Sequence, residues 1–183
     1  MAGTVAPVPT AVDRISRLIR DVPDFPAPGI TFRDITPLLA DAEALAEAVS
    51  GLAEPWLGAA VTKVAGIEAR GFILAAPVAL HLGAGFTPLR KPGKLPWRVE
   101  REAYDLEYGS DALEVHADAL GPGDRVLVVD DVLATGGTAA AGARLVERAG
   151  ASVAGVAVLL ELASLAGRDR LAGRDVRALL REA

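Results

Sequence analysis

The chain has 183 residues, of which 51% are hydrophobic, and this length and composition suit one α/β domain with a sizeable core. Its net charge of -5 argues against a general nucleic-acid binder, and no hydrophobic run is long or pure enough to span a membrane. The absence of cysteine excludes disulfides, a thiol nucleophile and a cysteine-bound metal. The N-terminus lacks the basic and then apolar pattern of a signal peptide, so none is expected. The absence of cysteine fits the expectation of a cytoplasmic protein.

The N-terminal part of the chain is predicted to be helical on both sides of a proline-rich loop. Thr10 with Asp13 provides the capping pattern of a first helix. Pro23, Pro26 and Pro28 forbid a regular helix around them. The predicted elements are a disordered tail (1–9), a helix (10–20), an extended loop (24–34) and a second helix (41–53).

The middle of the chain is predicted to alternate strands and helices around one irregular basic segment. Pro77 should kink or divide the helix that contains it. The segment 92–101 combines glycine, prolines and charges, so it is expected to be a mobile flap. The predicted elements are a strand (60–65), a helix (71–82), a strand (86–90), the flap (92–101) and hairpin strands (103–108 and 112–117) around Gly109-Ser110.

The C-terminal part is predicted to add a strand (125–129), a helix (138–149) that stops at Gly150, and a buried strand (152–160). Strands that alternate with helices predict a mostly parallel sheet whose ligands bind at the carboxyl ends of the strands. No repeat or long linker divides the chain, so residues 10–183 are predicted to form a single domain. Residues 174–183 are assigned no function.

The most informative stretch is RVLVVDDVLATGGT, residues 125–138. A buried strand is followed by Asp130 and Asp131 and then by a loop of small residues at a helix start. Backbone N–H groups at such a start face an anion, and paired carboxylates can accept hydrogen bonds from neighbouring hydroxyls. The stretch therefore predicts a site for a sugar phosphate, with Asp131 at a solvent-accessible strand end.

Three other interpretations apply to such a stretch. It is not a nucleotide P-loop, because Thr138 and not lysine follows Gly137. It also lacks the GxGxxG spacing of a dinucleotide site. A tight turn after a strand, with two solvated acids at its beginning, is the structural alternative.

Basic residues crowd one segment of this acidic chain. A focused cluster of positive charge favours a polyanionic ligand, whereas a solvated charged loop is the plain alternative. The residues are Arg90, Lys91, Lys94, Arg98 and Arg101.

VLVVDDVLATGGT resembles the 5-phosphoribosyl 1-pyrophosphate (PRPP) motif of the type I phosphoribosyltransferases. Four further blocks resemble the adenine phosphoribosyltransferases of that family, keep the family's order and extend the resemblance over most of residues 13–165. They are DFPAPGITFRDIT (24–36), GIEARGF (66–72), RKPGKLP (90–96) and YDLEYG (104–109).

The resemblance implies a role for each segment. The acids Asp130 and Asp131 would hold the ribose hydroxyls, and the 5-phosphate would be wrapped by Ala134, Thr135, Gly136, Gly137 and Thr138. Pyrophosphate would be bound by Glu68, Ala69, Arg70, Arg90, Lys91 and Lys94. The Glu68–Ala69 peptide is a candidate cis bond, and Ala69 stands where the family often has serine.

The resemblance also implies a base site and a catalytic acid. Thr31, Phe32 and Arg33 would hold adenine, since an aromatic ring can stack on a purine. Glu107 would stabilise developing positive charge on the ribose or handle the purine proton. From residue type alone, Phe32 could instead fill a core, Glu107 could be a surface acid, and Arg70 could form a surface salt bridge.

The family relationship implies a single-domain type I phosphoribosyltransferase fold: a mostly parallel twisted sheet flanked by helices, an N-terminal hood (24–36) and a flexible flap (91–107). It implies that the phosphoribosyl group of PRPP is transferred to adenine in purine salvage. It implies Mg²⁺ that is bound mainly through PRPP and pyrophosphate, with no direct protein metal site. It also implies a homodimer in which Arg90 reaches toward the site of the neighbouring subunit. A phosphoribosyltransferase for another base and a non-catalytic PRPP-sensing regulator are the alternatives. No nucleic-acid or membrane partner is expected.

Overall fold

The computed structural model describes residues 10–105 and 110–183. The described residues fall into two compact units, which are divided between Ala48 and Val49. The predicted tail (1–9) and the candidate catalytic Glu107 lie outside the described residues.

The first unit combines short helices with a two-stranded antiparallel sheet. Its elements are α1 (Ala11–Arg17), β1 (Arg20–Val22), β2 (Phe32–Asp34), α2 (Thr36–Ala40) and the first part of α3 (Ala42–Ala53). The predicted cap of the first helix is confirmed, because the Asp13 amide donates to Thr10 Oγ1 at 3.2 Å and the Thr10 amide donates to Asp13 Oδ2 at 3.1 Å. The prediction of loop up to residue 34 is wrong at its end, since β2 pairs with β1.

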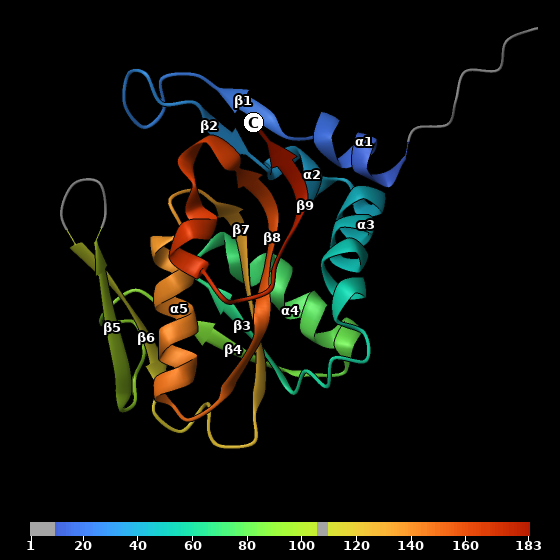
Figure 1. Ribbon diagram of the computed structural model, residues 1–183. Coiled ribbons are helices and arrows are strands. Elements are labelled where there is room, and N and C mark those ends of the chain that lie inside the picture. Colours follow the sequence, from blue (N-terminus) through green and yellow to red (C-terminus); the bar gives the residue numbers. More distant parts are fainter. Residues whose placement is uncertain (1–9, 106–109) are drawn as a thin grey trace, which may run out of the picture. The chain divides into compact units, whose positions relative to one another are not determined.

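The second unit contains the main sheet. Its elements are η1 (Glu54–Trp56), β3 (Lys63–Ile67), α4 (Arg70–Leu82), β4 (Gly85–Leu89), β5 (Val99–Asp105), β6 (Ser110–His116), β7 (Arg125–Leu133), α5 (Gly137–Arg148), β8 (Ser152–Leu162), η2 (Ala163–Leu165), η3 (Gly167–Leu171) and β9 (Val176–Glu182). Five strands form a parallel sheet in the order β4-β3-β7-β8-β9, and β5 and β6 form a separate antiparallel hairpin (Figure 1). The predicted parallel sheet and hairpin are therefore confirmed.

Helices α4 and α5 pack against opposite faces of this sheet. A Cβ placed on Gly66 would meet Ala75 of α4, whereas Gly142 of α5 lies over Ile67 and Val128. Because successive strand residues point to opposite faces, Gly66 and Ile67 mark the two sides. The core that results is apolar on both faces, with Val64 and Leu127 buried on the α4 side and Ile67 and Val128 on the α5 side, as is usual for a parallel sheet.

Several elements differ from the sequence prediction in their bounds or their continuity. Strand β3 begins at Lys63 and not at residue 60, because Ala60 has a φ of 53°, which a strand does not accommodate. Strand β5 begins at Val99, so the predicted flap (92–101) loses its last residues to the hairpin. Helix α4 continues through Pro77 as one helix, so the proline does not divide it.

Strand β9 was not predicted at all. It covers most of the segment 174–183, to which no function was assigned, and it pairs in parallel with β8. Only Val176 of this strand is buried, and the other residues are half-buried or exposed. Such a pattern lacks the apolar run that identifies a buried strand in a sequence.

Candidate active site

Two neighbouring strands of the second unit bring the predicted sugar-phosphate and pyrophosphate residues to one edge of the sheet. Strands β3 and β7 are parallel and adjacent, so their carboxyl ends meet there. A cavity of about 500 Å³ lies at this edge, and it is the candidate site. It is lined by Ile67, Glu68, Ala69, Arg70, Lys91, Asp130, Asp131, Val132, Ala134 and Thr138.

The two acids of the motif lie within β7 and not beyond its end. The ladder between β7 and β8 continues to Leu133, so Asp130 and Asp131 point to opposite sides of a strand. The prediction of a solvent-accessible Asp131 is wrong, because the residue is only 5% exposed. Its carboxylate forms an ion pair with Arg70, with Nε 2.5 Å from Oδ2.

The start of α4 explains how Arg70 reaches this acid. A Cβ on Gly71 would lie 2.9 Å from Asp130 Oδ1 and 3.0 Å from the Val129 carbonyl oxygen. Glycine therefore permits the first turn of α4 to pack directly on the end of β7. The predicted cis peptide bond between Glu68 and Ala69 is present immediately before this turn.

The electrostatics of the acid pair are asymmetric. Burial raises the pKa of Asp130 well above its ordinary value, and the charge of Asp131 raises it further. The Asp131 amide, which donates to Asp130 Oδ1 at 2.9 Å, and the Arg70 cation act in the opposite direction. Asp130 is therefore harder to ionise than an ordinary aspartate when no ligand is bound.

The loop after β7 has the geometry of an anion site. Gly136, with a φ of 79°, precedes α5, and no side chain caps the start of this helix. A Cβ on Gly136 would lie 2.2 Å from the carbonyl oxygen of Gly167, so the loop is pressed against η3. A small cavity of about 70 Å³ lies within the curve of the loop. Uncapped N–H groups at a helix start favour a bound phosphate.

The basic segment gathers around Glu68. Its Oε2 accepts hydrogen bonds from Arg90 Nε at 3.2 Å and from the Lys91 amide at 2.9 Å, and its Oε1 pairs with Lys94. Burial raises the pKa of Glu68, but these donors outweigh it and the pKa is lowered overall. The carboxylate is thus the counter-ion of Arg90 and Lys94, and it also accepts from the backbone of Lys91; all three were predicted, like Glu68, to bind pyrophosphate. Arg90 contacts an acid of its own chain here.

Lys91 also makes contacts that the sequence did not indicate. Its ammonium group donates to Tyr104 Oη at 2.5 Å and forms an ion pair with Asp111. Tyr104 lies on β5 and Asp111 on β6, directly opposite each other. Strands β5 and β6 flank residues 106–109, which include Glu107 and lie outside the described part of the chain.

The residues predicted to bind adenine belong to the first unit. Phe32 is half-buried and packs edge-to-face on Phe25, with ring centroids 5.3 Å apart. Arg33 pairs with Asp21 on the neighbouring strand, and Thr31 is exposed. Phe32 is therefore not a deeply buried core residue of this unit.

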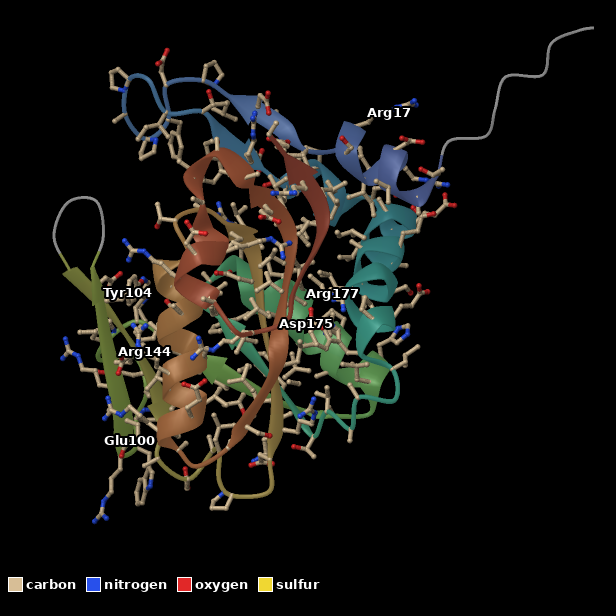
Figure 2. The ribbon with its side chains drawn as sticks, viewed as in Figure 1. Arg17, Glu100, Tyr104, Arg144, Asp175 and Arg177 are labelled. Atoms are coloured by element: carbon tan, nitrogen blue, oxygen red, sulfur yellow. The ribbon has the colours of Figure 1, made fainter. Side chains whose placement is uncertain are left out.

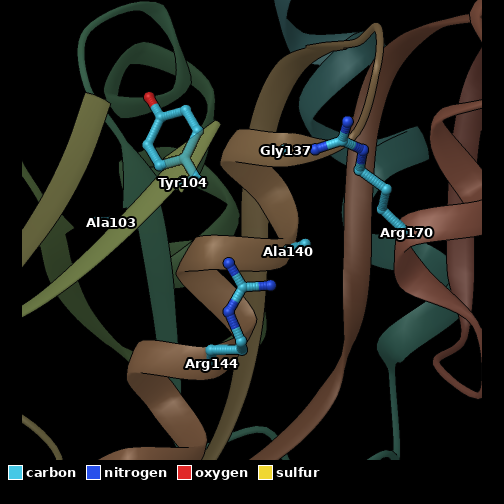
Figure 3. Close-up of a pocket in the computed structure, with 6 residues that line it drawn as sticks. All are labelled: Ala103, Tyr104, Gly137, Ala140, Arg144 and Arg170. Carbon is cyan, nitrogen blue, oxygen red and sulfur yellow. The ribbon is translucent and has the colours of Figure 1, made fainter. Parts of the chain in front are cut away.

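A second cavity of about 420 Å³ lies beside α5, between the hairpin and η3. Tyr104, Arg144 and Arg170 border it, and the Tyr104 hydroxyl points away from Arg144 (Figure 3). Arg144 is paired with Glu102 at 2.5 Å. Tyr104, Arg144 and Glu100 lie along the hairpin side of α5 (Figure 2). Gly137 is the only predicted site residue among those lining this cavity.

Residues 10–105 and 110–183 contain no group of at least three His, Cys, Asp or Glu side chains that could hold a metal ion. In the same part of the chain, every helix is too short or too polar to cross a membrane.

Comparisons with known proteins agree with one another. Residues 32–177 match the model of the phosphoribosyl transferase domain family. The chain is 60% identical to an adenine phosphoribosyltransferase of Thermobifida fusca over 165 residues, which cover 90% of this chain and 94% of that protein.

Solved structures give the same result. The crystal structure of adenine phosphoribosyltransferase from Rhodothermus marinus has a TM-score of 0.90 and 55% identity, covering 94% of this chain and 98% of that one. The enzyme from Saccharomyces cerevisiae, solved in a complex with adenine, has a TM-score of 0.88 and 35% identity, covering 93% and 98%.

Proposed function

The chain belongs to the adenine phosphoribosyltransferase branch of the phosphoribosyltransferase family, and from that premise we propose how its residues perform the reaction of the family. The reaction is the transfer of the phosphoribosyl group of PRPP to adenine, which forms AMP and pyrophosphate and salvages the purine. The observation that carries the assignment of residues is the cavity of about 500 Å³, which is lined by the acid pair and by the cations Arg70 and Lys91.

In this proposal the acid pair and the loop after it bind the ribose 5-phosphate half of PRPP. Asp130 and Asp131 accept hydrogen bonds from the two ribose hydroxyls. The backbone N–H groups and threonine hydroxyls of residues 134–138 hold the 5-phosphate at the start of α5. The uncapped start of that helix and its small cavity support this assignment.

The pyrophosphate is assigned to the opposite wall of the same cavity. Arg70 and Lys91 line it, and the backbone at Glu68 and Ala69 turns there from β3 into α4. Arg90 and Lys94 are assigned to the pyrophosphate as well, because both contact Glu68, which lines this cavity. Mg²⁺ would enter with PRPP and pyrophosphate, whose oxygens are the hard ligands it prefers, and would reduce the charge of the leaving group. The described residues supply no protein cage for it, so no residue is assigned as its ligand.

Chemistry at the ribose requires the C1–O bond to pyrophosphate to break while a C1–N bond to adenine forms and the base loses a proton. The breaking bond gives C1 oxocarbenium character, as in glycoside hydrolysis. We assign Glu107 to that charge or to the purine proton. Thr31, Phe32 and Arg33 are assigned to the base, with Phe32 stacking on the ring.

The assembly and location are also part of the proposal. We infer a homodimer in which Arg90 exchanges its contact with Glu68 for the neighbouring site. Light scattering on the active enzyme tests this, and a fully active monomer would contradict it. The lack of cysteine is compatible with a reducing compartment such as the cytoplasm.

The proposed function is tested by measuring which base the enzyme accepts. Purified protein is mixed with Mg²⁺, PRPP and adenine, hypoxanthine or guanine, and catalytic efficiency is measured for each base. A rigid site that pairs with the amino donor and bare ring nitrogen of adenine leaves groups unpaired against hypoxanthine, so a preference of about 10⁴ is expected. Comparable efficiency with hypoxanthine would refute adenine specificity. PRPP binding without product from any base would instead indicate a regulator.

A further inference from the structure

Tyr104 of β5 and Asp111 of β6, near the end of the strand pairing that adjoins residues 106–109, converge on one lysine. Tyr104 and Asp111 are directly opposite in the antiparallel register, so their side chains lie on the same face of the hairpin. Tyr104 Oη accepts a hydrogen bond from Lys91 Nζ at 2.5 Å and donates to Asp111 Oδ2 at 3.2 Å. Asp111 pairs with the same ammonium group. The three residues form a closed triangle of polar contacts, which we call the lysine clamp.

The backbone of Lys91 is fixed independently of this clamp. Arg90, the preceding residue, exchanges two backbone hydrogen bonds with Glu114 of β6, at 2.8 and 2.7 Å. The Lys91 amide donates to Glu68 at 2.9 Å. Because the backbone is already held on both sides, the clamp is not needed to locate this segment. Its effect falls on the orientation of the ammonium group.

Lys91 is at the same time a wall of the candidate site, together with Arg70 and the acid pair. An ammonium group has three N–H donors and no acceptor. Among the described residues, Tyr104 and Asp111 use two of these donors. Within residues 10–105 and 110–183, the third donor stays available to an anion in the cavity.

We propose that Tyr104 and Asp111 are positioning residues for the transfer reaction, which orient Lys91 so that its third donor meets the pyrophosphate group. The proposal rests on the assignment of Lys91 to pyrophosphate. Burial lowers the pKa of Lys91, but its bonds to Asp111 and Tyr104 outweigh burial and raise it overall, so the group is charged at neutral pH. The rival possibility is that Asp111 competes with the ligand for Lys91, in which case its removal would strengthen pyrophosphate binding.

The test measures the affinities of Mg²⁺-pyrophosphate and of ribose 5-phosphate by calorimetry for each variant. Asp111→Ala removes the acceptor and should weaken pyrophosphate binding about 5- to 20-fold, because a hydrogen bond to a charged group is lost. Asp111→Asn, which keeps an acceptor, and Tyr104→Phe should each weaken it about 2- to 5-fold. Ribose 5-phosphate affinity should stay unchanged in all three. Glu102→Gln is the matched control, because it breaks an ion pair of the same hairpin without touching Lys91.

A background variant, Lys91→Met, separates the proposal from its premise. It should weaken pyrophosphate binding, and Asp111→Ala should have no further effect in that background if the acid acts through the lysine. If Lys91→Met binds pyrophosphate normally, the assignment of Lys91 fails and the clamp proposal fails with it. If only Lys91→Met is impaired, or if both Asp111 variants bind pyrophosphate more tightly, the positioning role alone is overturned. Equal loss of both ligands in Asp111→Ala would show a general structural role and would overturn it too.

Discussion

Arg70 and Asp131 form an ion pair across the candidate site, with the arginine Nε 2.5 Å from the aspartate Oδ2. The acid side chain is 7% exposed and the arginine side chain 40%, so a buried carboxylate is compensated by a cation that solvent still reaches. The two residues are assigned to different halves of PRPP. Binding of the substrate would therefore engage both partners of one pair.

Asp131→Asn should weaken PRPP binding by about 1.5–3 kcal/mol of binding free energy. The reason is the loss of a charge-assisted hydrogen bond to a ribose hydroxyl. The variant also removes the charge that compensates Arg70, so some loss of stability is expected with it. Steady-state kinetics with varied PRPP and urea unfolding measure the two effects. Asp124→Asn is the control, since Asp124 pairs with Lys63 just before the opposite end of β7. PRPP kinetics unchanged in Asp131→Asn would exclude this acid from the site.

Asp130→Asn should stabilise the ligand-free protein at neutral pH while it weakens ribose binding. The pKa of Asp130 is raised in the folded protein, so the folded state binds more protons than the unfolded chain. The stability that this extra proton binding gives the folded state is complete below the ordinary aspartate pKa of 3.8. It is lost as the pH rises through the raised pKa of Asp130 in the folded protein. Asparagine keeps an acceptor for the Asp131 amide and removes the cost of the buried charge.

The measurement is the free energy of unfolding of the variant minus that of the parent, followed from acid to neutral pH. The difference should be smallest near pH 4 and should increase as the pH rises, since acids that do not interact with Asp130 titrate equally in both proteins. A difference that is constant with pH would show that the carboxyl group of Asp130 titrates as an ordinary surface acid.

Local patterns in the sequence were enough to predict much of this fold. The apolar strand of the motif, the glycine stop at Gly150 and the Thr10 cap were all identified from near neighbours, and the structure has each of them. The parallel sheet followed from the alternation of strands and helices. These features depend on interactions within one element or between consecutive elements.

The remaining features depend on partners that are distant in the chain. The strand that contains Asp130 and Asp131 was predicted to end before them, yet β8 extends the ladder through both. Three of the cations assigned to pyrophosphate have partners from other segments: Glu68, between β3 and α4, pairs with Arg90 and Lys94, and Asp111 of the hairpin pairs with Lys91. A charge in a sequence does not identify its counter-ion, because the pair is made by the folded chain.

Glu107→Gln should lower turnover by about 10²–10⁴ if the acid acts in the transition state, which is the range for a positioned acid or base. The KM for adenine should change much less. Rapid-quench measurements of a single turnover, with saturating PRPP, report the chemical step directly. Glu102→Gln provides a carboxylate-to-amide control on β5, where the acid pairs with Arg144 and Arg148 of α5. A loss confined to adenine binding would make Glu107 a binding residue only.

Gly136→Ala should damage the phosphate loop more than the same change does elsewhere. Gly136 and Gly58 both have a φ of 79°, so alanine pays a left-handed strain of about 1–2 kcal/mol at either position. The space around them differs: a Cβ on Gly136 would lie 2.2 Å from the Gly167 carbonyl oxygen, whereas nothing lies within 4 Å at Gly58. Gly136→Ala should therefore lose about 1–3 kcal/mol more stability than Gly58→Ala. It should also bind ribose 5-phosphate about tenfold more weakly than Gly58→Ala, because the loop must move to make room for the methyl group. Equal stability and equal ribose 5-phosphate affinity in the two variants would show that the contact with η3 does not shape this loop.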